Sequence, residues 1–432
     1  MTSELALGID FGTSGARAIA INSTEKVVAQ SACLFAQIGP ADSPTTWHRA
    51  LFKILGQITP DIRQRVERIA LNGTSATMLL CDRDGQPLSA PLMYSDSSAR
   101  GALDEVRKLA PANSSAVLSA TSTLTKALWL YRNGTPNARA SFPHGSYITH
   151  QADLLASWLH QRQPVTDYHN ALKLGYDVKA LAYPDWLLAS PIANWLPKVL
   201  APGEAIAPIS QQIAERAGFP PTCQICTGTT DSTAAFLASG ATQAGEAVTS
   251  LGSTLVLKLL SPQPVEAQPF GIYSHRLGDL WLVGGASNTG GAVLSRFFTP
   301  EQLASLSDRI VPNVPCDLDY YPLNSPGERF PINDPDYPPR LTPRPDSDRE
   351  FLHGLLNAMA RIEAEGYQKL QDLRAPRLKK VYTAGGGAKN ETWRAIRQQK
   401  LGVDVVAAAQ TEAAYGTALL AMHGLSKFQH GS

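Results

Sequence analysis

The stretch from residue 5 to residue 22 constrains the fold more than any other part of the chain. An apolar run ends at Asp10, a turn containing Gly12 and Gly15 follows, and a second apolar run leads away from it. Two apolar runs joined by such a turn predict a β-hairpin with a carboxylate at the end of its first strand. The spacing therefore indicates a chain that begins with paired strands.

The turn between these strands has the composition of an anion site. Gly12 lets backbone N–H groups crowd around a ligand, and Thr13 and Ser14 add hydroxyl donors. Asp10 beside an anion would be repelled unless a cation lay between them, and a phosphate with Mg²⁺ satisfies all of these groups. An ordinary hairpin with a polar turn is the alternative, and this stretch alone leaves both open.

The same order of strand, small polar turn and strand recurs in the second half of the chain. Apolar residues 248–251 precede Gly252, Ser253 and Thr254, and an apolar run resumes at Val256. Two similar turns in two halves predict a duplicated fold that holds a phosphate between the halves.

Asp231 is the second carboxylate of interest. It follows a short strand-like run and opens an Ala-rich helix expected at 234–238. By itself it is read as a helix N-cap, but together with Asp10 and two phosphate turns it becomes a candidate general base.

Polar residues after the strand expected at 66–71 are candidates for substrate contact. Ser75 lies in the segment 72–77, where α/β sheets place ligand contacts, although serine also caps turns. Asp96 is either a substrate carboxylate or a helix cap. Lys126 is interpreted as a snorkelling lysine on a helix face.

A glycine triplet follows the strand expected at 378–383. Three consecutive glycines let a flat ligand lie against the backbone, Asn390 offers a bidentate amide edge, and Trp393 lies in the helix beyond. The triplet consists of Gly385, Gly386 and Gly387.

Length and composition set the remaining limits. The 432 residues exceed one compact core and predict two domains, and 44% hydrophobic with 17% charged residues is typical of a soluble globular protein. A net charge of +1 favours neither nucleic acid nor an anionic membrane as a partner. Five cysteines and a start without signal-peptide character predict a cytoplasmic protein, or one of the plastid stroma if it is from a plant.

Other stretches complete the outline. Periodic apolar residues predict helices at 44–58 and 350–372, and residues 412–421 predict a helix of small residues that packs closely on a neighbour. The segment 312–346, rich in Pro, Asp and Arg, is expected to be irregular surface structure.

The order of these motifs resembles the FGGY carbohydrate kinase family of the actin-like ATPase superfamily, from Leu7 to about His423. Two departures are visible. The family's Trp-x-Asp-x-Arg sugar motif stands here as Tyr94-Ser95-Asp96 with Arg100 displaced, so whether Asp96 or Arg100 touches sugar stays open. The family's Lys-aromatic-x-Trp signature appears as residues 126–129. The segment 72–77 looks most like cyanobacterial and plant-type D-ribulose kinases. The most specific motifs are Asp10-Phe11-Gly12-Thr13-Ser14, Gly228–Asp231 with Gly252-Ser253-Thr254, Gly327–Pro331, and Gly385-Gly386-Gly387 with Asn390 and Trp393.

The resemblance implies an α/β fold of two ribonuclease H-like domains facing across a cleft. The sugar-binding domain is expected at residues 1–238, with a C-terminal helix at 412–432 returning to it, and the nucleotide-binding domain at 239–411. A monomer or homodimer is expected.

It also implies an ATP- and Mg²⁺-dependent kinase for the C5 hydroxyl of a pentulose, D-ribulose above all. In this assignment Asp231 is the general base, Asp10 holds Mg²⁺ and bonds the sugar, and Thr13 contacts the γ-phosphate. Sugar is implied at Asp10, Ser75 and Asp231. ATP is implied at Gly12, Thr13, Ser14, Gly252, Ser253, Thr254, Gly385, Gly386, Gly387, Asn390 and Trp393.

Two alternatives stay open. One is a D-xylulose kinase, which differs in the orientation of one substrate hydroxyl. The other is an actin-like nucleotide-driven switch without a sugar acceptor, which would need neither Asp231 nor a polar pocket at Ser75.

Overall fold

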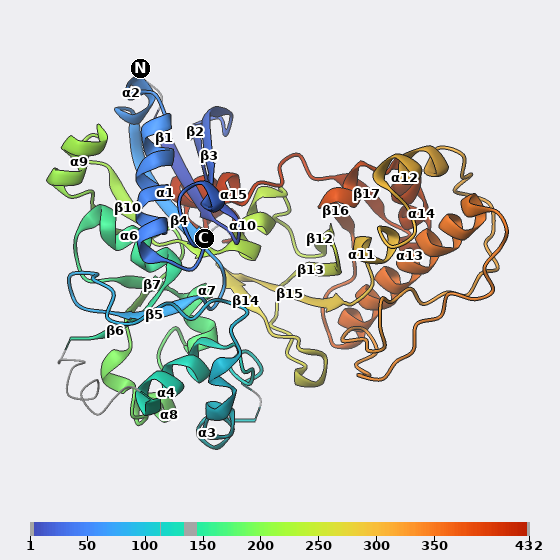
Figure 1. Ribbon diagram of the computed structural model, residues 1–432, viewed down its shortest axis with the longest axis horizontal. Helices are drawn as coiled ribbons and strands as arrows, with labels where there is room; N and C mark the ends of the chain where they lie inside the picture. Colours follow the sequence, from blue (N-terminus) through green and yellow to red (C-terminus); the bar gives the residue numbers. More distant parts are fainter. Residues whose placement is uncertain (1–3, 113, 134–144, 430–432) are drawn as a thin grey trace. The chain divides into compact units, whose positions relative to one another are not determined.

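The computed structural model describes residues 4–112, 114–133 and 145–429 (Figure 1). The chain divides into two compact units. The first unit comprises Met1–Ala238 with Glu412–Gln429, and the second comprises Ser239–Thr411. The C-terminal helix predicted to span 412–432 is shorter: α15 runs over Ala413–His423, a 3-10 turn follows at Ser426–Phe428, and residues 430–432 lie outside the described residues.

The first unit is built on a seven-stranded sheet in the order β3-β2-β1-β4-β10-β9, with β11 beside β4. The predicted hairpin is confirmed, because β1 and β2 pair antiparallel and β3 extends them into a meander. β4 runs parallel to β1, and both β10 and β11 run parallel to β4. The strands are β1 Leu5–Phe11, β2 Gly15–Asn22, β3 Val27–Leu34, β4 Val66–Gly73, β9 Ala205–Pro208, β10 Gln224–Cys226 and β11 Thr229–Thr230.

The two faces of this sheet carry different helices (Figure 1). Leu7 and Ile9 of β1 point into a core shared with α1 (Pro44–Gln57), α6 (Gln151–His160) and α9 (Gln211–Ala217). The alternate residue Ala6 packs on the opposite face against α15. Because side chains alternate along a strand, Asp10 belongs to this α15 face.

α15 approaches the sheet and its neighbour α10 (Asp231–Ala238) at backbone distance. A Cβ added to Gly8 would lie 2.1 Å from the carbonyl oxygen of Ala414, and one added to Gly416 would lie 1.9 Å from that of Ala234. Neither position has room for a side chain. The prediction that small residues let this helix pack closely is confirmed.

A smaller layer of the first unit surrounds the two-stranded sheet of β5 and β6. It has its own apolar core, which includes residues of α3 and α4. Its elements, with those that connect it to the main sheet, are β5 Met78–Cys81, α3 Leu103–Leu109, α4 Thr123–Asn133, β6 Tyr147–His150, β7 Val165–Asp167, α7 Tyr168–Ala171, α8 Asp185–Leu188 and β8 Lys198–Leu200. The short helix α2, Pro60–Arg63, lies between α1 and β4.

The second unit contains a six-stranded sheet in the order β14-β15-β13-β12-β16-β17 and a core against the long helix α13. β12 and β13 form the second predicted hairpin. The elements are β12 Glu246–Leu251, β13 Leu255–Ser261, β14 His275–Leu277, β15 Leu280–Ser287, α11 Gly291–Leu294, α12 Pro300–Ser307, α13 Asp348–Asp372, β16 Lys380–Ala384, α14 Glu391–Leu401 and β17 Asp404–Ala407.

The segment 312–346 is irregular, as predicted, but the prediction that it is surface structure is wrong for its middle part. Tyr320 and Phe330 are buried in the core of the second unit. Buried Glu328 accepts hydrogen bonds from the hydroxyls of Ser287 and Tyr321, which joins the segment to the end of β15. The many charged residues of this segment indicated an exposed position, although its aromatic residues Tyr320 and Phe330 are buried.

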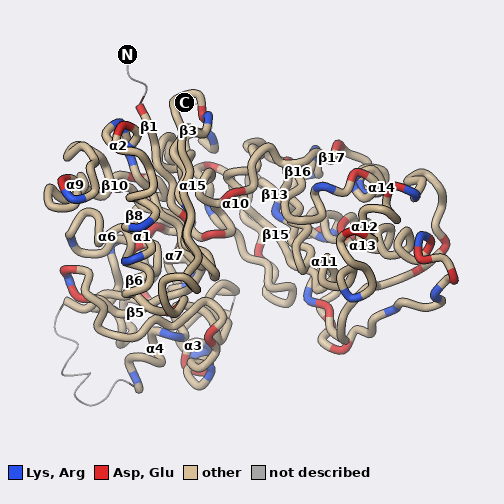
Figure 2. Tube along the Cα trace, turned by 45° about the horizontal axis from the view of Figure 1, so that its top comes forward, with Lys and Arg blue, Asp and Glu red and all other residues tan. Residues whose placement is uncertain are grey.

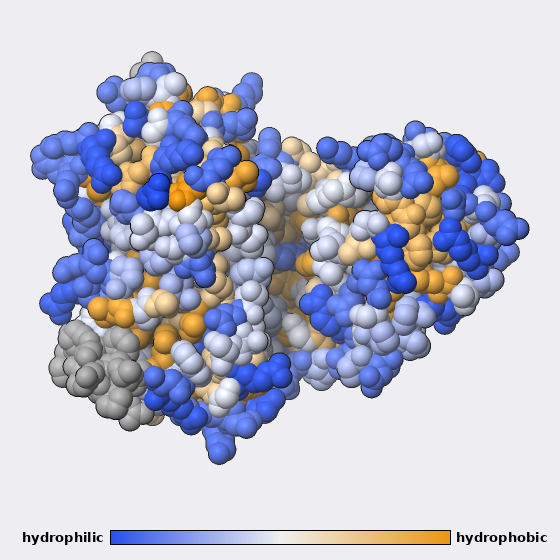
Figure 3. Space-filling view, in the orientation of Figure 1, coloured by the Kyte–Doolittle hydropathy of each residue, from blue (hydrophilic) through white to orange (hydrophobic). Residues whose placement is uncertain are grey.

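Acidic and basic residues are interspersed along the trace of each unit (Figure 2). The drawn face of each unit is mostly polar, with separate small apolar patches (Figure 3). Within the described ranges, none of the helices combines the length and the apolar character needed to span a membrane.

Candidate active site

Three neighbouring parallel strands of the first unit end at the same edge of its sheet. The register pairs Asp10 of β1 with Asn72 of β4, and Asn72 with Thr229 of β11. One residue further on, β1 ends at Phe11, and two residues after Thr229 the chain reaches Asp231. The carboxyl ends of parallel strands are where α/β sheets bind ligands. Two of the predicted catalytic residues are therefore brought to one edge.

Asp10 is 7% exposed and carries an unusual electrostatic load. Its pKa is raised from 3.8 to about 7, mainly by burial and also by the charges of Asp231 and Glu412, against opposing effects of Arg17 and Asn72. The guanidinium near this carboxyl group, that of Arg17, is paired with Glu412.

Two residues near Asp10 were missed by the sequence reasoning. Arg17 stands opposite Asp10 across the β1–β2 pair and forms an ion pair of 3.3 Å with Glu412. The sequence could have indicated Arg17, because counting residues outward from the turn along both strands places it opposite Asp10. Asn72 donates to the hydroxyl of Thr417 at 2.6 Å, and its side-chain oxygen has no hydrogen-bond partner among the described residues. Its role depends on α15, which is more than 300 residues away in sequence.

Asp231 is the first residue of α10 and is half-buried. Its Oδ1 accepts a hydrogen bond of 2.8 Å from the backbone N–H of Ser232. An N-cap side chain normally accepts from the second or third helical N–H instead. One carboxylate oxygen is thus oriented by the backbone, and Oδ2 has no hydrogen bond among the described contacts.

The turn with Gly12, Thr13 and Ser14 connects β1 to β2 at the same edge. The N–H of Gly12 donates to the carbonyl of Gly15 at 3.0 Å, and Phe35 donates to the carbonyl of Ser14 at 2.9 Å. The side chains of Thr13 and Ser14 are exposed. Backbone hydrogen bonds fix the loop while its hydroxyls remain accessible.

Ser75 is the only residue between Ile69 and Cys81 that is not buried. It follows the end of β4, one strand over from Asp10. Asp96 is half-buried, and hydrogen bonds from Ser98 hold its pKa below the usual value, as in a turn cap. Arg100 is exposed.

Lys126 was interpreted as a snorkelling lysine, and this is wrong. Its side chain is fully buried, and its ammonium group donates to the carbonyls of Ala76 at 2.9 Å and Met93 at 2.6 Å. The acceptors come from segments 50 and 33 residues away, so its burial could not be read from the helix pattern alone.

The second unit contains a cavity of about 790 Å³ at the turn between β12 and β13. This size suits a small-molecule ligand. The turn is held from behind, because Gly291 donates to the carbonyl of Gly252 at 2.8 Å and Ala292 to that of Ser253 at 3.1 Å. The predicted nucleotide residues that line the cavity are Gly252, Ser253, Gly386, Gly387, Asn390 and Trp393; Thr254 and Gly385 do not line it.

The three glycines of the triplet differ in the space around them. Gly385 has a φ of +84°, and a Cβ there would lie 2.7 Å from the carbonyl oxygen of Leu251. A Cβ on Gly387 would lie 2.6 Å from Trp393, whereas none of the described atoms lies within 4 Å of one on Gly386. Only Gly386 leaves open backbone for a flat ligand.

Asn390 and Trp393 are more structural than predicted. The Asn390 amide caps α14 by accepting from the N–H of Trp393 at 2.9 Å, and it donates to Ser307 at 2.8 Å. The predicted bidentate amide edge is therefore already engaged. Trp393 is 3% exposed within the core, but its indole N–H has no partner among the described residues.

The chemistry of the Asp10 edge fits a hard divalent cation. Within the described ranges no group of three His, Cys, Asp or Glu side chains could hold a metal alone. Mg²⁺ commonly uses one or two carboxylates and completes its shell with water and phosphate oxygens. Asp10 is the carboxylate predicted for this role, and the charge of Asp231 acts on it.

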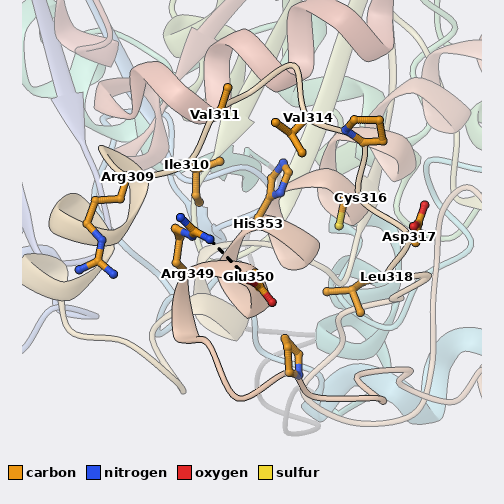
Figure 4. A pocket seen from close by; sticks show the side chains of 12 residues that line it. Arg309, Ile310, Val311, Val314, Cys316, Asp317, Leu318, Arg349, Glu350 and His353 are labelled. Atoms are coloured by element: carbon orange, nitrogen blue, oxygen red, sulfur yellow. Dashed lines mark hydrogen bonds and ion pairs between the residues drawn. The ribbon is translucent and has the colours of Figure 1, made fainter.

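A second cavity of the second unit has about 380 Å³ and contains none of these residues (Figure 4). It is lined by residues 309–311 and 314–318 together with Pro345, Arg349, Glu350 and His353. Arg349 and Glu350 pair with each other at 3.4 Å on its wall. The cavity has neither a strand-end carboxylate nor a glycine turn, so it is not a candidate for the predicted chemistry.

Comparison with known families gives two matches in chain order. Residues 5–238 match the N-terminal domain of the FGGY family of carbohydrate kinases, and residues 247–425 match its C-terminal domain. Together the matches span nearly the whole chain. They favour a kinase over the nucleotide-driven switch considered above.

The individual proteins similar to this chain are named as kinases of different acceptors. An L-fuculokinase from Escherichia coli (strain K12) is 24% identical over 468 residues, covering 99% of this chain and 94% of its own. A xylulose kinase from Lactobacillus acidophilus has a TM-score of 0.81 at 18% identity, covering 98% and 90%. A glycerol kinase from Plasmodium falciparum has a TM-score of 0.82 at 16% identity, covering 100% and 93%. The predicted two-domain α/β fold is confirmed, while the resemblance to D-ribulose kinases stays a prediction.

Proposed function

The chain belongs to the FGGY family of carbohydrate kinases, and from that premise we propose that it transfers the γ-phosphate of ATP to the C5 hydroxyl of a pentulose, with D-ribulose as the best acceptor. The observation that carries the proposal is the shared sheet edge of the first unit. There β1, β4 and β11 end side by side and bring Asp10, the Ser75 turn and Asp231 together. A carboxylate pair beside a polar turn suits an alcohol acceptor.

Asp231 is proposed as the general base. Its Oδ1 is oriented by the N–H of Ser232, and its half-buried position leaves Oδ2 for the proton of the sugar hydroxyl. As the hydroxyl oxygen bonds to the γ-phosphorus, the bond from phosphorus to the β,γ-bridging oxygen breaks, ADP leaves and the proton passes to Asp231. The protein otherwise positions the reactants and balances charge.

Asp10 is proposed to hold Mg²⁺ through water and to bond the sugar. Bound there, Mg²⁺ would neutralise phosphate charge, which is the usual role of the metal in phosphoryl transfer. A cation beside Asp10 also lowers the pKa of that carboxyl group from about 7, so the residue would be ionised in the working complex. Thr13, on the neighbouring turn, is proposed to contact the γ-phosphate.

The nucleotide is assigned to the cavity of the second unit. Gly252 and Ser253 are proposed to donate to the β-phosphate, and the open backbone at Gly386 is proposed to face the adenine ring. Trp393 forms a wall of this cavity from within the core. Trp393 is therefore expected to support ATP binding by maintaining the shape of the cavity.

The acceptor class follows from the polar groups available at the edge. Asp10, Ser75 and Asp231 offer few contacts, which suits a five-carbon ketose better than a hexose. D-xylulose is the second candidate, because a xylulose kinase is among the structures similar to this chain. A site that hydrogen-bonds the distinguishing hydroxyl can reject the epimer, since a buried partner is otherwise left unpaired.

The proposal is tested by an ADP-release screen with D-ribulose, D-xylulose, L-fuculose and glycerol, each against a sugar-free control. We expect pentulose-dependent ADP release with phosphate attached at C5, which ³¹P and ¹³C NMR of the product would identify. ADP release that is equal with and without every acceptor would reject the proposed kinase. Phosphorylation of glycerol or L-fuculose alone would reject the pentulose assignment.

A further inference from the structure

Lys126 occupies a position that lysine rarely takes. It is fully buried, and its ammonium group donates to two backbone carbonyls. A buried charge is costly unless several hydrogen bonds compensate it. Burial lowers its pKa to about 8, while the charge of Asp96 acts in the opposite direction. Leu or Met would fill this buried position without the cost of burying a charge. We therefore look for the role of the amine in its two hydrogen bonds.

One of the two carbonyls belongs to the Ser75 turn of the proposed sugar site, and the other belongs to a segment that is hydrogen-bonded to this turn. The carbonyl of Ala76 is in the turn that exposes Ser75, and that of Met93 immediately precedes Tyr94, which is followed by Asp96. Asp96 itself donates its N–H to the same Met93 carbonyl at 2.9 Å. One ammonium group from α4 thus contacts two neighbouring loops, which the hydrogen bond from the N–H of Tyr94 to Thr77 also joins.

The Ser75 turn is strained and needs such support. Ala76 has a φ of +66° and is buried, a conformation that costs a non-glycine residue of the order of 1 kcal/mol. Thr77 Oγ1 accepts from the N–H of Tyr94 at 2.9 Å and contacts Thr74 Oγ1 at 2.6 Å. The Gln151 side chain accepts from the N–H of Thr74 at 3.0 Å. The turn is therefore fixed from three sides.

We propose that Lys126 is a positioning residue that clamps the Ser75 turn to the Tyr94–Asp96 segment and thereby sets recognition of the sugar. This inference rests on the proposed function, because it takes Ser75 to face the acceptor. The clamp leaves Ser75 as the only incompletely buried residue of its stretch while every neighbour is held. Without it, the buried carbonyl of Ala76 loses its ammonium donor, the carbonyl of Met93 keeps only the N–H of Asp96, and the strained turn can relax.

The test compares Lys126→Met with wild type and with Lys173→Met. Methionine keeps the length and apolar stem but has no donor. Lys173 is half-exposed in the same unit and influences Lys126 only through its charge, which makes it a matched control. Two readouts are measured: amide hydrogen exchange of peptides covering 71–80 and 90–99, and the KM values for D-ribulose and ATP.

Lys126→Met should speed exchange in both peptides at least fivefold and raise the KM for D-ribulose about tenfold, with the KM for ATP within twofold. Lys173→Met should match wild type in the exchange of both peptides, in the KM for D-ribulose and in the KM for ATP. Unchanged exchange in either peptide would overturn the clamp, and so would equal increases in both KM values. Wild-type protein that phosphorylates no pentulose would reject the proposed function instead, and the exchange comparison would still decide the clamp.

Discussion

Two carboxyl groups at one sheet edge determine what the chain can catalyse at the residue scale. Asp10 is buried and Asp231 is half-buried, and the charge of Asp231 raises the pKa of Asp10. Environments that differ in this way let one group bind a cation while the other accepts a proton. The two residues therefore yield separate predictions.

Asp231→Asn should lower kcat by about a hundredfold or more, because asparagine cannot accept the proton of the attacking hydroxyl. The KM for ATP should change little, since the nucleotide is assigned to the second unit. Steady-state kinetics with the preferred pentulose measure both values. A variant with near-normal kcat would reduce Asp231 to a residue that starts α10.

Asp10→Asn should change the pH dependence of stability in the absence of metal and nucleotide. The unfolded chain ionises Asp10 above about pH 3.8, whereas the folded chain retains the proton up to about pH 7. The stability contributed by this raised pKa is complete below pH 3.8 and is lost as the pH rises to about 7.

At pH 8 the asparagine variant should therefore be more stable than wild type by on the order of 1–4 kcal/mol. The difference should vanish near pH 4. Chemical denaturation at the two pH values measures it. Asp167, whose burial also raises its pKa to about 7, is present in both proteins and cancels in the comparison. A difference that is the same at pH 4 and pH 8 would contradict the electrostatic description of Asp10.

Residues at strand ends could be predicted from the sequence because the signal is local. An apolar run, a carboxylate and a glycine turn identify Asp10 without any tertiary information. Lys126, Asn72 and Asn390 could not be understood this way, because their partners come from Ala76, Thr417 and Ser307. The hydrogen-bond partners of a buried polar group come from segments that only the folded structure brings together.

At the scale of elements, α15 is the part of the chain that closes the site face of the first unit. It packs on β1 at Gly8 and on α10 at Gly416, so it fixes the distance between the helix that starts at Asp231 and the strand that ends after Asp10. The sequence indicated close packing through its small residues. It did not indicate that Glu412, just before the helix, pairs with Arg17.

Gly416→Ala should destabilise the protein by about 1–3 kcal/mol or more, because the added methyl group would overlap the backbone of α10. Gly56→Ala is the matched control: Gly56 also lies in a helix, α1, but none of the described atoms lies within 4 Å of its added Cβ. Alanine there should be neutral or slightly stabilising. Denaturant midpoints of the two variants measure the contrast, and equal shifts would show that α15 does not pack at backbone distance.

At the scale of the whole molecule, each unit has its own core and its own candidate site. The first holds the carboxylates and the Ser75 turn, and the second holds the cavity at Gly252 and Gly386. Each unit contains one of the two repeated hairpins, with a strand, a small polar turn and a strand. The choice of sugar is not encoded in such repeats, because it depends on single hydroxyl contacts.

The most direct measurement is kcat/KM of the wild-type protein for D-ribulose and for D-xylulose with saturating MgATP. The account predicts that D-ribulose is preferred at least tenfold and that its product carries phosphate on C5. A preference for D-xylulose, or equal values for the two epimers, would contradict the assignment of D-ribulose as the acceptor.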